Sequence, residues 1–480
     1  MNGTGTRRVS KAGAFFCTTI VAMALNTGAA QAQNWVVEKG VLPRGTTYEM
    51  RKPNNWNGVL IDDLDFAGSP DVPRYLVLLN NGYAVAGTAR RADRTTAYDP
   101  AHELIDLINV MDMFAAKFGK PKRTIQLGFS GGGHDTLAFV EQHPDRVDGA
   151  VAACAHTPVW LMNSELDSWF TLQTLIAPNL QVVNLPAASN PGLTTAWRAA
   201  LADAQKTAIG RARIALATTV GQHNAWISAT TPEPDPNNID ALQNSMYQMF
   251  DQTAAQVGGQ SRYMFEQSVP GQPSWNTGVD YVEAFKRGDP AYQRAVKKLY
   301  EAAGASLDDD LAKLNAADRV AADPKAVQWW SYPGRTVVGE PKVPVLRIHT
   351  NGDGAVPISL VAGYDALVKT MGHQDLYRRA FVNRDGHCNF TGAEVIAAVE
   401  TVMQRLDNGE WGPVTPTALN KLGAKLDPTS TPKYFNYKQF KYNRTWVPTP
   451  QDYLGLFGQP ELIRNIPPSR ALEETGEAED

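Results

Sequence analysis

The chain is poor in cysteine, in histidine and in long apolar runs, and it carries little excess charge of either sign. Of its 480 residues, three are cysteine and eight are histidine, and the formal net charge is -4. A nearly balanced charge is not typical of a protein that binds nucleic acid, so we expect no nucleic-acid partner. The 43% of hydrophobic residues are enough for a full-size core with one extra domain or large insertion.

The few histidines also argue against a metal site. Their positions show none of the short spacings that hold a metal ion, and we expect neither a metal nor another cofactor. The six without such spacing are His102, His143, His156, His223, His349 and His373. His134 lies in a glycine-rich segment, and we expect it to pack beneath that segment rather than to react.

The first 32 residues have the pattern of a secretory signal peptide. A basic start is followed by the apolar segment "AGAFFCTTIVAMAL" (12–25), and the small residues "AQA" end at Ala32. We therefore expect export, to a periplasm or out of the cell. The pair of arginines leaves open whether the chain is exported folded or unfolded. No later run reaches about 18 apolar residues, so we expect a soluble mature protein without a stable membrane anchor.

Strand-like and helix-like segments alternate up to about residue 155. Alternation or apolar runs predict strands at 45–53, 57–66, 82–90 and 123–130, and the apolar residues of 102–120 recur at helical spacing. Strands that alternate with helices favour a mostly parallel sheet with helices on both faces.

The alternation is interrupted once, which divides the mature chain. Residues 33–155 and 341–409 read as two parts of one α/β core, and the long helical stretches of 156–340 read as an inserted cap or lid domain. The tail, 410–480, is rich in proline and aromatic residues. We expect it to pack on the body of the protein, with a mobile acidic end.

"GFSGG" (128–132) places Ser130 between a predicted strand and a predicted helix. A nucleophile on so sharp a turn needs small neighbours, and the free N–H groups at the start of the helix point to where an oxyanion forms. We interpret Ser130 as the nucleophile and Gly131 as the first oxyanion donor. The alternative is an ordinary glycine-rich loop.

An acid and a base follow later in the chain. Asp353 stands in the turn "NGDG" directly after a predicted strand, although turn chemistry alone would also explain it. His387 lies in the loop between the last predicted strand and the last helix. Asp385 is the rival acid, but a residue so close to His387 in sequence rarely reaches the far ring nitrogen.

The order Ser130, Asp353, His387 is that of the α/β-hydrolase fold, and the chain resembles the secreted serine hydrolases of that superfamily. The resemblance implies an α/β-hydrolase fold, a mostly parallel sheet flanked by helices, with a large and mainly helical cap. It also implies the roles: Ser130 attacks the carbonyl, His387 transfers the proton and Asp353 orients the imidazole.

The pair His387-Cys388 resembles tannases and feruloyl esterases. In those enzymes the cysteine after the histidine is bonded to one just before the serine, and here Phe129 occupies that place. Cys154 ends the next predicted strand, close to where the histidine loop must cross, and we expect a Cys154–Cys388 disulfide. Two buried free thiols are the alternative.

The oxyanion residues follow from the same comparison. The second oxyanion donor should lie in the loop after 57–66, where many relatives have His-Gly and this chain has "DFAG". We expect the N–H of Phe66 or Ala67 to serve, with Asp65 close to the substrate.

The residues themselves, rather than the resemblance, suggest two substrate-binding residues. Arg90, with Arg91 and Arg94, follows the predicted strand 82–90 and is a candidate to hold a substrate carboxylate, although arginines more often form structural salt bridges. Trp160 follows Cys154 closely, near the strand ends, although large aromatics usually build core.

These observations predict an exported serine hydrolase that cleaves carboxylic esters, of small molecules or oligomers, through an acyl-enzyme. An aminopeptidase or amidase with the same three residues is the alternative. A hydrolase fold used only for binding is the third interpretation, against which the intact serine, aspartate and histidine argue. The sequence leaves the oligomeric state open.

Overall fold

A computed structural model describes residues 34–185, 187, 190–227, 231–257, 260–269 and 271–446. The predicted signal peptide and the last part of the tail, from residue 447 onward, lie outside the described residues.

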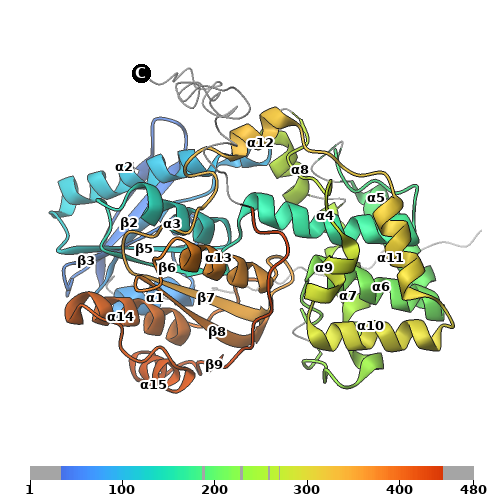
Figure 1. Cartoon of the computed structure of the whole chain (residues 1–480). Coiled ribbons are helices and arrows are strands. Elements are labelled where there is room, and N and C mark those ends of the chain that lie inside the picture. Colours follow the sequence, from blue (N-terminus) through green and yellow to red (C-terminus); the bar gives the residue numbers. More distant parts are fainter. Residues whose placement is uncertain are drawn as a thin grey trace, which may run out of the picture. The chain divides into compact units, whose positions relative to one another are not determined.

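A nine-stranded, mostly parallel sheet runs through the protein (Figure 1). Its order is β1-β2-β4-β3-β5-β6-β7-β8-β9, in which β3 to β8 pair in parallel and the edge pairs β1–β2, β2–β4 and β8–β9 are antiparallel. The strands are β1 (Trp35–Val41), β2 (Thr47–Pro53), β3 (Val59–Asp63), β4 (Ala84–Thr88), β5 (Arg123–Phe129), β6 (Gly149–Ala153), β7 (Val345–Gly352), β8 (Tyr377–Asp385) and β9 (Tyr434–Phe435).

Helices cover both faces of this sheet, and the alternation of side chains explains how. Leu60 of β3 points into one cluster, with residues of α2 (Pro100–Phe118), α3 (Gly131–Gln142) and α13 (Ser359–Thr370). The next residue, Ile61, points into the opposite cluster, with residues of α1 (Pro73–Asn80), α14 (Gly392–Asn408) and α15 (Pro416–Leu426). Successive side chains of a strand face opposite sides, and a strand buried on both faces is mostly apolar. β3 departs from this rule at its end, where Asp62 and Asp63 are buried.

The helical segment 158–330 is inserted between β6 and β7, and it has a hydrophobic cluster of its own. Trp169, Trp197 and Phe250 are among the buried residues at its centre. The helices are α4 (Pro158–Leu175), α5 (Pro191–Gln205), α6 (Ala208–Gly221), α7 (Ile239–Val257), α8 (Gln260–Gln267), α9 (Tyr281–Arg287), α10 (Pro290–Ala302), α11 (Leu307–Ala316) and α12 (Pro324–Trp330). The mainly helical insertion is confirmed; its division from the core as a separate domain stays a prediction.

The elements predicted from the sequence are present, and several were missed. The structure adds the edge strand β1, the short helix α1 and, in the tail, α15 and β9. A capping box between Thr391 and Glu394 begins α14. In the described part of the tail, Tyr434 and Tyr442 are buried, which agrees with a tail that packs on the body.

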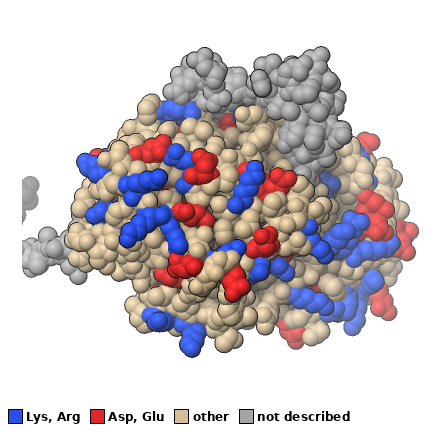
Figure 2. All heavy atoms as spheres, turned by 60° about the vertical axis from the view of Figure 1, so that its left-hand side comes forward, with Lys and Arg blue, Asp and Glu red and all other residues tan. Residues whose placement is uncertain are grey.

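The surface charges are mixed. On the face that Figure 2 shows, lysine and arginine side chains are interspersed with aspartate and glutamate, and neither sign covers a whole side. None of the helices in the described ranges combines the length and the apolar character that crossing a bilayer requires.

Candidate active site

Ser130 lies on a strained turn between β5 and α3. Its φ of 59° is in the left-handed region, which costs a non-glycine residue free energy and is typical of functional sites. The neighbouring glycines are required by close approach: a β-carbon on Gly128 would lie 2.0 Å from the carbonyl oxygen of Gly132. Another on Gly133 would lie 2.6 Å from the carbonyl oxygen of Ala153. The glycine-rich segment therefore forms a tight turn between a strand and a helix rather than an open loop.

His387 and Asp353 complete a hydrogen-bonded chain with Ser130. The Nε2 atom of His387 is 2.7 Å from the Ser130 hydroxyl oxygen, and its Nδ1 atom is 2.9 Å and 2.8 Å from the two carboxylate oxygens of Asp353. All three distances are within hydrogen-bonding range. The His387 side chain is 32% exposed whereas Asp353 is fully buried, so the chain runs from the surface into the protein.

Asp353 is held in an ionised form by its surroundings. Burial by itself would raise its pKa, but the facing His387 and the hydrogen bonds it accepts lower the pKa below the usual value of a carboxyl group. Among those bonds, the N–H groups of Ala355 and Val356 donate to it at 2.9 Å and 2.8 Å. The rival acid, Asp385, is the last residue of β8, and the Nδ1 contacts of His387 go to Asp353 instead.

A disulfide ties the His387 loop to the sheet. Cys154, directly after β6, is bonded to Cys388, and their Cα atoms are 5.4 Å apart. Both residues have positive φ, so the backbone turns sharply at both ends of the bridge. The sulfurs and the His387 ring lie within 4.8 Å of one another, but bonded sulfurs are not thiolates and do not supply metal ligands.

The predicted oxyanion donors differ in their availability. Gly131 is the first residue of α3, and such an N–H has no acceptor within its own helix. By contrast, the N–H of Ala67 donates to the carbonyl of Thr88 at 3.1 Å, and that of Phe66 lies 3.3 Å from the carbonyl of Asp63. In this conformation, therefore, neither of the two predicted N–H groups is free to bind an oxyanion.

The three residues named as substrate-binding have different surroundings. Asp65 and Arg90 form a two-pronged ion pair, with N–O distances of 2.6 Å and 2.8 Å, and the Arg90 side chain is 34% exposed. Trp160 is fully buried and donates its indole N–H to the carbonyl of Trp446. The prediction that Trp160 contacts substrate is wrong, because its ring packs in the core beside Tyr442.

Three further residues lie near the site, and two of them, Asn224 and His156, have no signal in the sequence. Asn224, from the loop after α6, donates its side-chain amide to the backbone carbonyl of Asp353 at 2.8 Å. His156 and Arg94 lie against Gly131: a β-carbon there would be 3.5 Å from the histidine Nε2 atom and 2.7 Å from the arginine Nη2 atom. These residues are distant from Ser130 in sequence, and only the fold places them beside it.

The strand order and the turn at Ser130 define the class of protein: the chain is an α/β-hydrolase. It belongs to the tannase-like family of unknown function, DUF6351, whose model matches residues 42–391. The o-phthalyl amidase of Xanthobacter agilis is 44% identical over 439 residues, which cover 86% of this chain and 97% of that protein. Family and relative together make the chain a hydrolase.

Solved structures of esterases resemble the chain more distantly. Feruloyl esterase B from Aspergillus oryzae has a TM-score of 0.37 at 14% identity, covering 78% of this chain and 80% of its own. Tannin acyl hydrolase from Aspergillus niger has a TM-score of 0.37 at 13% identity, covering 78% of each chain.

Proposed function

We propose that this protein is a serine hydrolase that cleaves carboxylic esters through an acyl-enzyme formed on Ser130. The observation that carries the proposal is the continuous hydrogen-bonded chain from the Ser130 hydroxyl through His387 to Asp353. This arrangement lets the imidazole accept the serine proton as the hydroxyl attacks a carbonyl carbon. The buried carboxylate of Asp353 then stabilises the imidazolium that forms.

The second half of the reaction uses the same groups. The imidazolium of His387 donates its proton to the leaving alcohol, and the acyl group stays on Ser130. A water molecule then gives up a proton to His387 and attacks the acyl-enzyme, which releases the acid and restores the serine. The N–H of Gly131 stabilises the oxyanion in both halves, because it is free at the start of α3.

Amide hydrolysis is the second candidate, and one observation favours it. The relative that is 44% identical over most of both chains is an o-phthalyl amidase. An amide needs the same nucleophile and oxyanion donor, but it depends more on His387 because a poor leaving amine must be protonated as the C–N bond breaks. We therefore include amides of aromatic acids among the candidate substrates.

We also propose that the protein is exported and acts on small or oligomeric substrates without a membrane anchor. The signal-peptide pattern of residues 1–32 and the Cys154–Cys388 disulfide support export, since disulfides persist in oxidising compartments. Mass measurement of the mature protein from its native host's periplasm and medium tests this. An intact N-terminus in the cytoplasm would contradict it.

The proposed reaction is tested with a fluorophosphonate probe and a substrate panel. We expect the probe to label the wild-type protein covalently at Ser130 and not the Ser130→Ala variant. Matched alkyl esters and anilides of benzoic acid then separate the two candidates, because a faster anilide would favour amidase activity. A folded wild-type protein that neither reacts with the probe nor turns over any ester or amide would refute the proposal.

A further inference from the structure

Two arginines converge on the residue beside the nucleophile. A β-carbon on Gly131 would lie 2.7 Å from Nη2 of Arg94 and 3.6 Å from Nη1 of Arg90. Arg90 also reaches the backbone of β5, where its Nη2 atom is 3.4 Å from the carbonyl of Phe129. Because Gly131 has no side chain, a space remains beside it that guanidinium groups line. This space lies within a few bonds of the position that an acyl group on Ser130 would occupy.

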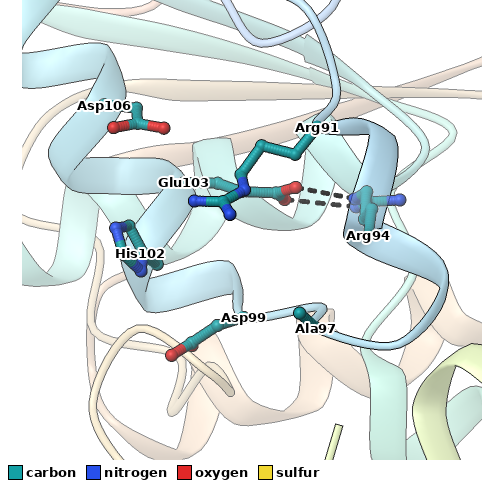
Figure 3. A pocket seen from close by; sticks show the side chains of 7 residues that line it. All are labelled: Arg91, Arg94, Ala97, Asp99, His102, Glu103 and Asp106. Carbon is teal, nitrogen blue, oxygen red and sulfur yellow. Dashed lines mark hydrogen bonds and ion pairs between the residues drawn. The ribbon is translucent and has the colours of Figure 1, made fainter. Parts of the chain in front are cut away.

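Each arginine is held from behind by a carboxylate. Arg94 donates from Nε and Nη2 to Glu103, at 2.6 Å and 3.1 Å, and Figure 3 shows this carboxylate reaching Arg94 from α2, beside a small cavity. Arg90 uses the same edge of its guanidinium on Asp65. These two-pronged pairs fix the planes of both guanidinium groups, which reduces the entropy lost when a ligand binds.

Each guanidinium keeps one nitrogen without a strong acceptor. Within the described ranges, the contact of Arg94 Nη1 is the Met264 sulfur at 3.8 Å, a weak acceptor, and Arg90 Nη1 has none. Arg94 is nearly buried, with a side chain 9% exposed, whereas Arg90 is 34% exposed and accessible to a ligand. The N–H groups on these two nitrogens can therefore donate to a ligand that supplies oxygen atoms.

The surrounding charges also favour an anion. Burial and the neighbouring Glu103 raise the pKa of Asp135 well above the usual value of a carboxyl group, which favours its neutral form. Arg74 adds a third positive charge that acts on Asp65. Arg90 and Arg94 thus each pair with one carboxylate, Asp65 and Glu103, whereas the charge of Arg74 is shared between Asp63 and Asp65.

We propose that Arg90 and Arg94 form a subsite for a carboxylate on the acyl part of the substrate, so that the preferred substrates are half-esters or half-amides of dicarboxylic acids. This inference rests on the proposed function of Ser130. His387 protonates the leaving group, so the leaving group lies on the His387 side and the acyl group on the Gly131 side. Because the arginines touch Gly131, the carboxylate stands close to the reacting carbonyl, as it does in a 2-carboxybenzoyl group.

The test compares three esters of one size class: monomethyl phthalate, with a free carboxylate, dimethyl phthalate, with that group masked, and methyl benzoate, without it. We expect wild-type kcat/KM to be highest for monomethyl phthalate. In the Arg90→Gln variant, we expect kcat/KM for monomethyl phthalate to fall about 10- to 100-fold further than for methyl benzoate, as charge-assisted hydrogen bonds are lost. Arg90→Lys keeps the positive charge but lacks the two-pronged guanidinium geometry. Its kcat/KM for monomethyl phthalate should therefore lie between the values of the wild-type protein and of Arg90→Gln.

Arg123→Gln is the matched control, because Arg123 is similarly exposed at 28% and is paired with Asp407 away from the site. It should leave the preference unchanged. A wild-type protein that turns over methyl benzoate as fast as monomethyl phthalate, or an Arg90→Gln variant that loses both activities equally, would overturn the carboxylate subsite. An equal loss of activity on methyl benzoate and monomethyl phthalate would instead mean that Arg90 interacts with the reacting carbonyl itself.

A binding measurement separates this inference from the proposed reaction. Phthalate, compared with benzoate, should raise the Tm of the wild-type protein and of Arg123→Gln, and the difference should disappear in Arg90→Gln. This result would support the subsite even if no ester were hydrolysed, whereas absence of fluorophosphonate labelling concerns Ser130 alone. Equal effects of phthalate and benzoate on the wild-type Tm would overturn the subsite even in an active enzyme.

Discussion

The sheet with its flanking helices (the sheet region) and the helical segment 158–330 both bury apolar side chains, but they differ in where strained backbone occurs. Five non-glycine residues of the described chain have positive φ, and three of them, Ser130, Cys154 and Cys388, lie at the candidate site on strand ends and the adjoining loop. The helical segment has two: Gln222, just after α6, and Asn184, in the loop between α4 and α5. Strained backbone persists only where its surroundings hold it, and the sheet with its disulfide provides that support.

The helical segment, like the sheet region, buries charge. Arg262 lies within 3.9 Å of Glu165 and 3.5 Å of Glu266, and all three side chains are nearly inaccessible. Part of its contribution to the site runs through Asn224, which donates to the backbone carbonyl of Asp353. The sheet therefore positions the reacting groups, while Asn224 of the helical segment supports one of them from behind. Substitutions in the two regions should therefore differ in their effects on kcat and on stability.

The largest effect is expected from Asp353→Asn, which should lower kcat by about 10⁴-fold with little loss of stability in the helical segment. The amide cannot stabilise the imidazolium and favours the wrong tautomer of His387. Steady-state kinetics on the best ester of the panel measures this. Asp385→Asn is the control, because Asp385 is two residues from His387 yet makes no contact with its Nδ1 atom. A similar loss in both variants would contradict the assignment.

Removing the disulfide should destabilise the sheet region and disturb the candidate site. The double variant Cys154→Ser, Cys388→Ser should lose about 2–5 kcal/mol of unfolding free energy, because the bridge closes a long loop in the unfolded chain. It should also lower kcat, since Cys388 is adjacent to His387. Denaturant unfolding with and without a reductant measures the first effect. The reductant should not change the double variant, and an unchanged wild type under reduction would refute the prediction.

Asn224→Ala should break the link between the two regions. We expect a loss of about 1–3 kcal/mol in stability, because the carbonyl of Asp353 is left buried without its donor. A modest fall in kcat should accompany it, with KM little changed, if the carboxylate of Asp353 shifts. Asn237→Ala, an exposed position of the same segment, serves as the control. Equal behaviour of the two variants would show that the segment does not support the site.

The smallest effect concerns pH and the buried charges of the helical segment. Burial raises the pKa of Glu165 to about 7, and Arg262 offsets this only partly. The folded protein therefore binds a proton that the unfolded chain releases above its usual pKa of about 4.5, so this residue's contribution to stability falls as pH rises from about 4.5 to 7. Glu165→Gln should reduce the fall in Tm between pH 5 and 8 by about 2–4 °C.

Scanning calorimetry across that pH range measures the change. Glu283→Gln is the matched control, because Glu283 is 49% exposed and pairs with Lys286 on the surface of the same segment. If the pH dependence of Tm were the same in the two variants, Glu165 would not be the group that titrates.

Local patterns accounted for most of the sheet region. The strand before Ser130, the turn that holds Asp353 and the loop of His387 all follow from short-range periodicity and glycine placement. The missed elements have weak local signals: β1 is a half-exposed edge strand, and α1 has eight residues. Trp160 was misplaced because an aromatic near a strand end may face either the site or the core, and periodicity does not decide which.

By itself, the sequence determined the α/β class, the large helical insertion and the order of serine, aspartate and histidine, because these depend on neighbours along the chain. Only the tertiary structure decided which donors are free beside Ser130, that Asn224 supports Asp353, and that Arg90 and Arg94 meet at Gly131. Such contacts join residues dozens to hundreds of positions apart. They depend on how strands pair and helices pack, and no local spacing encodes that arrangement.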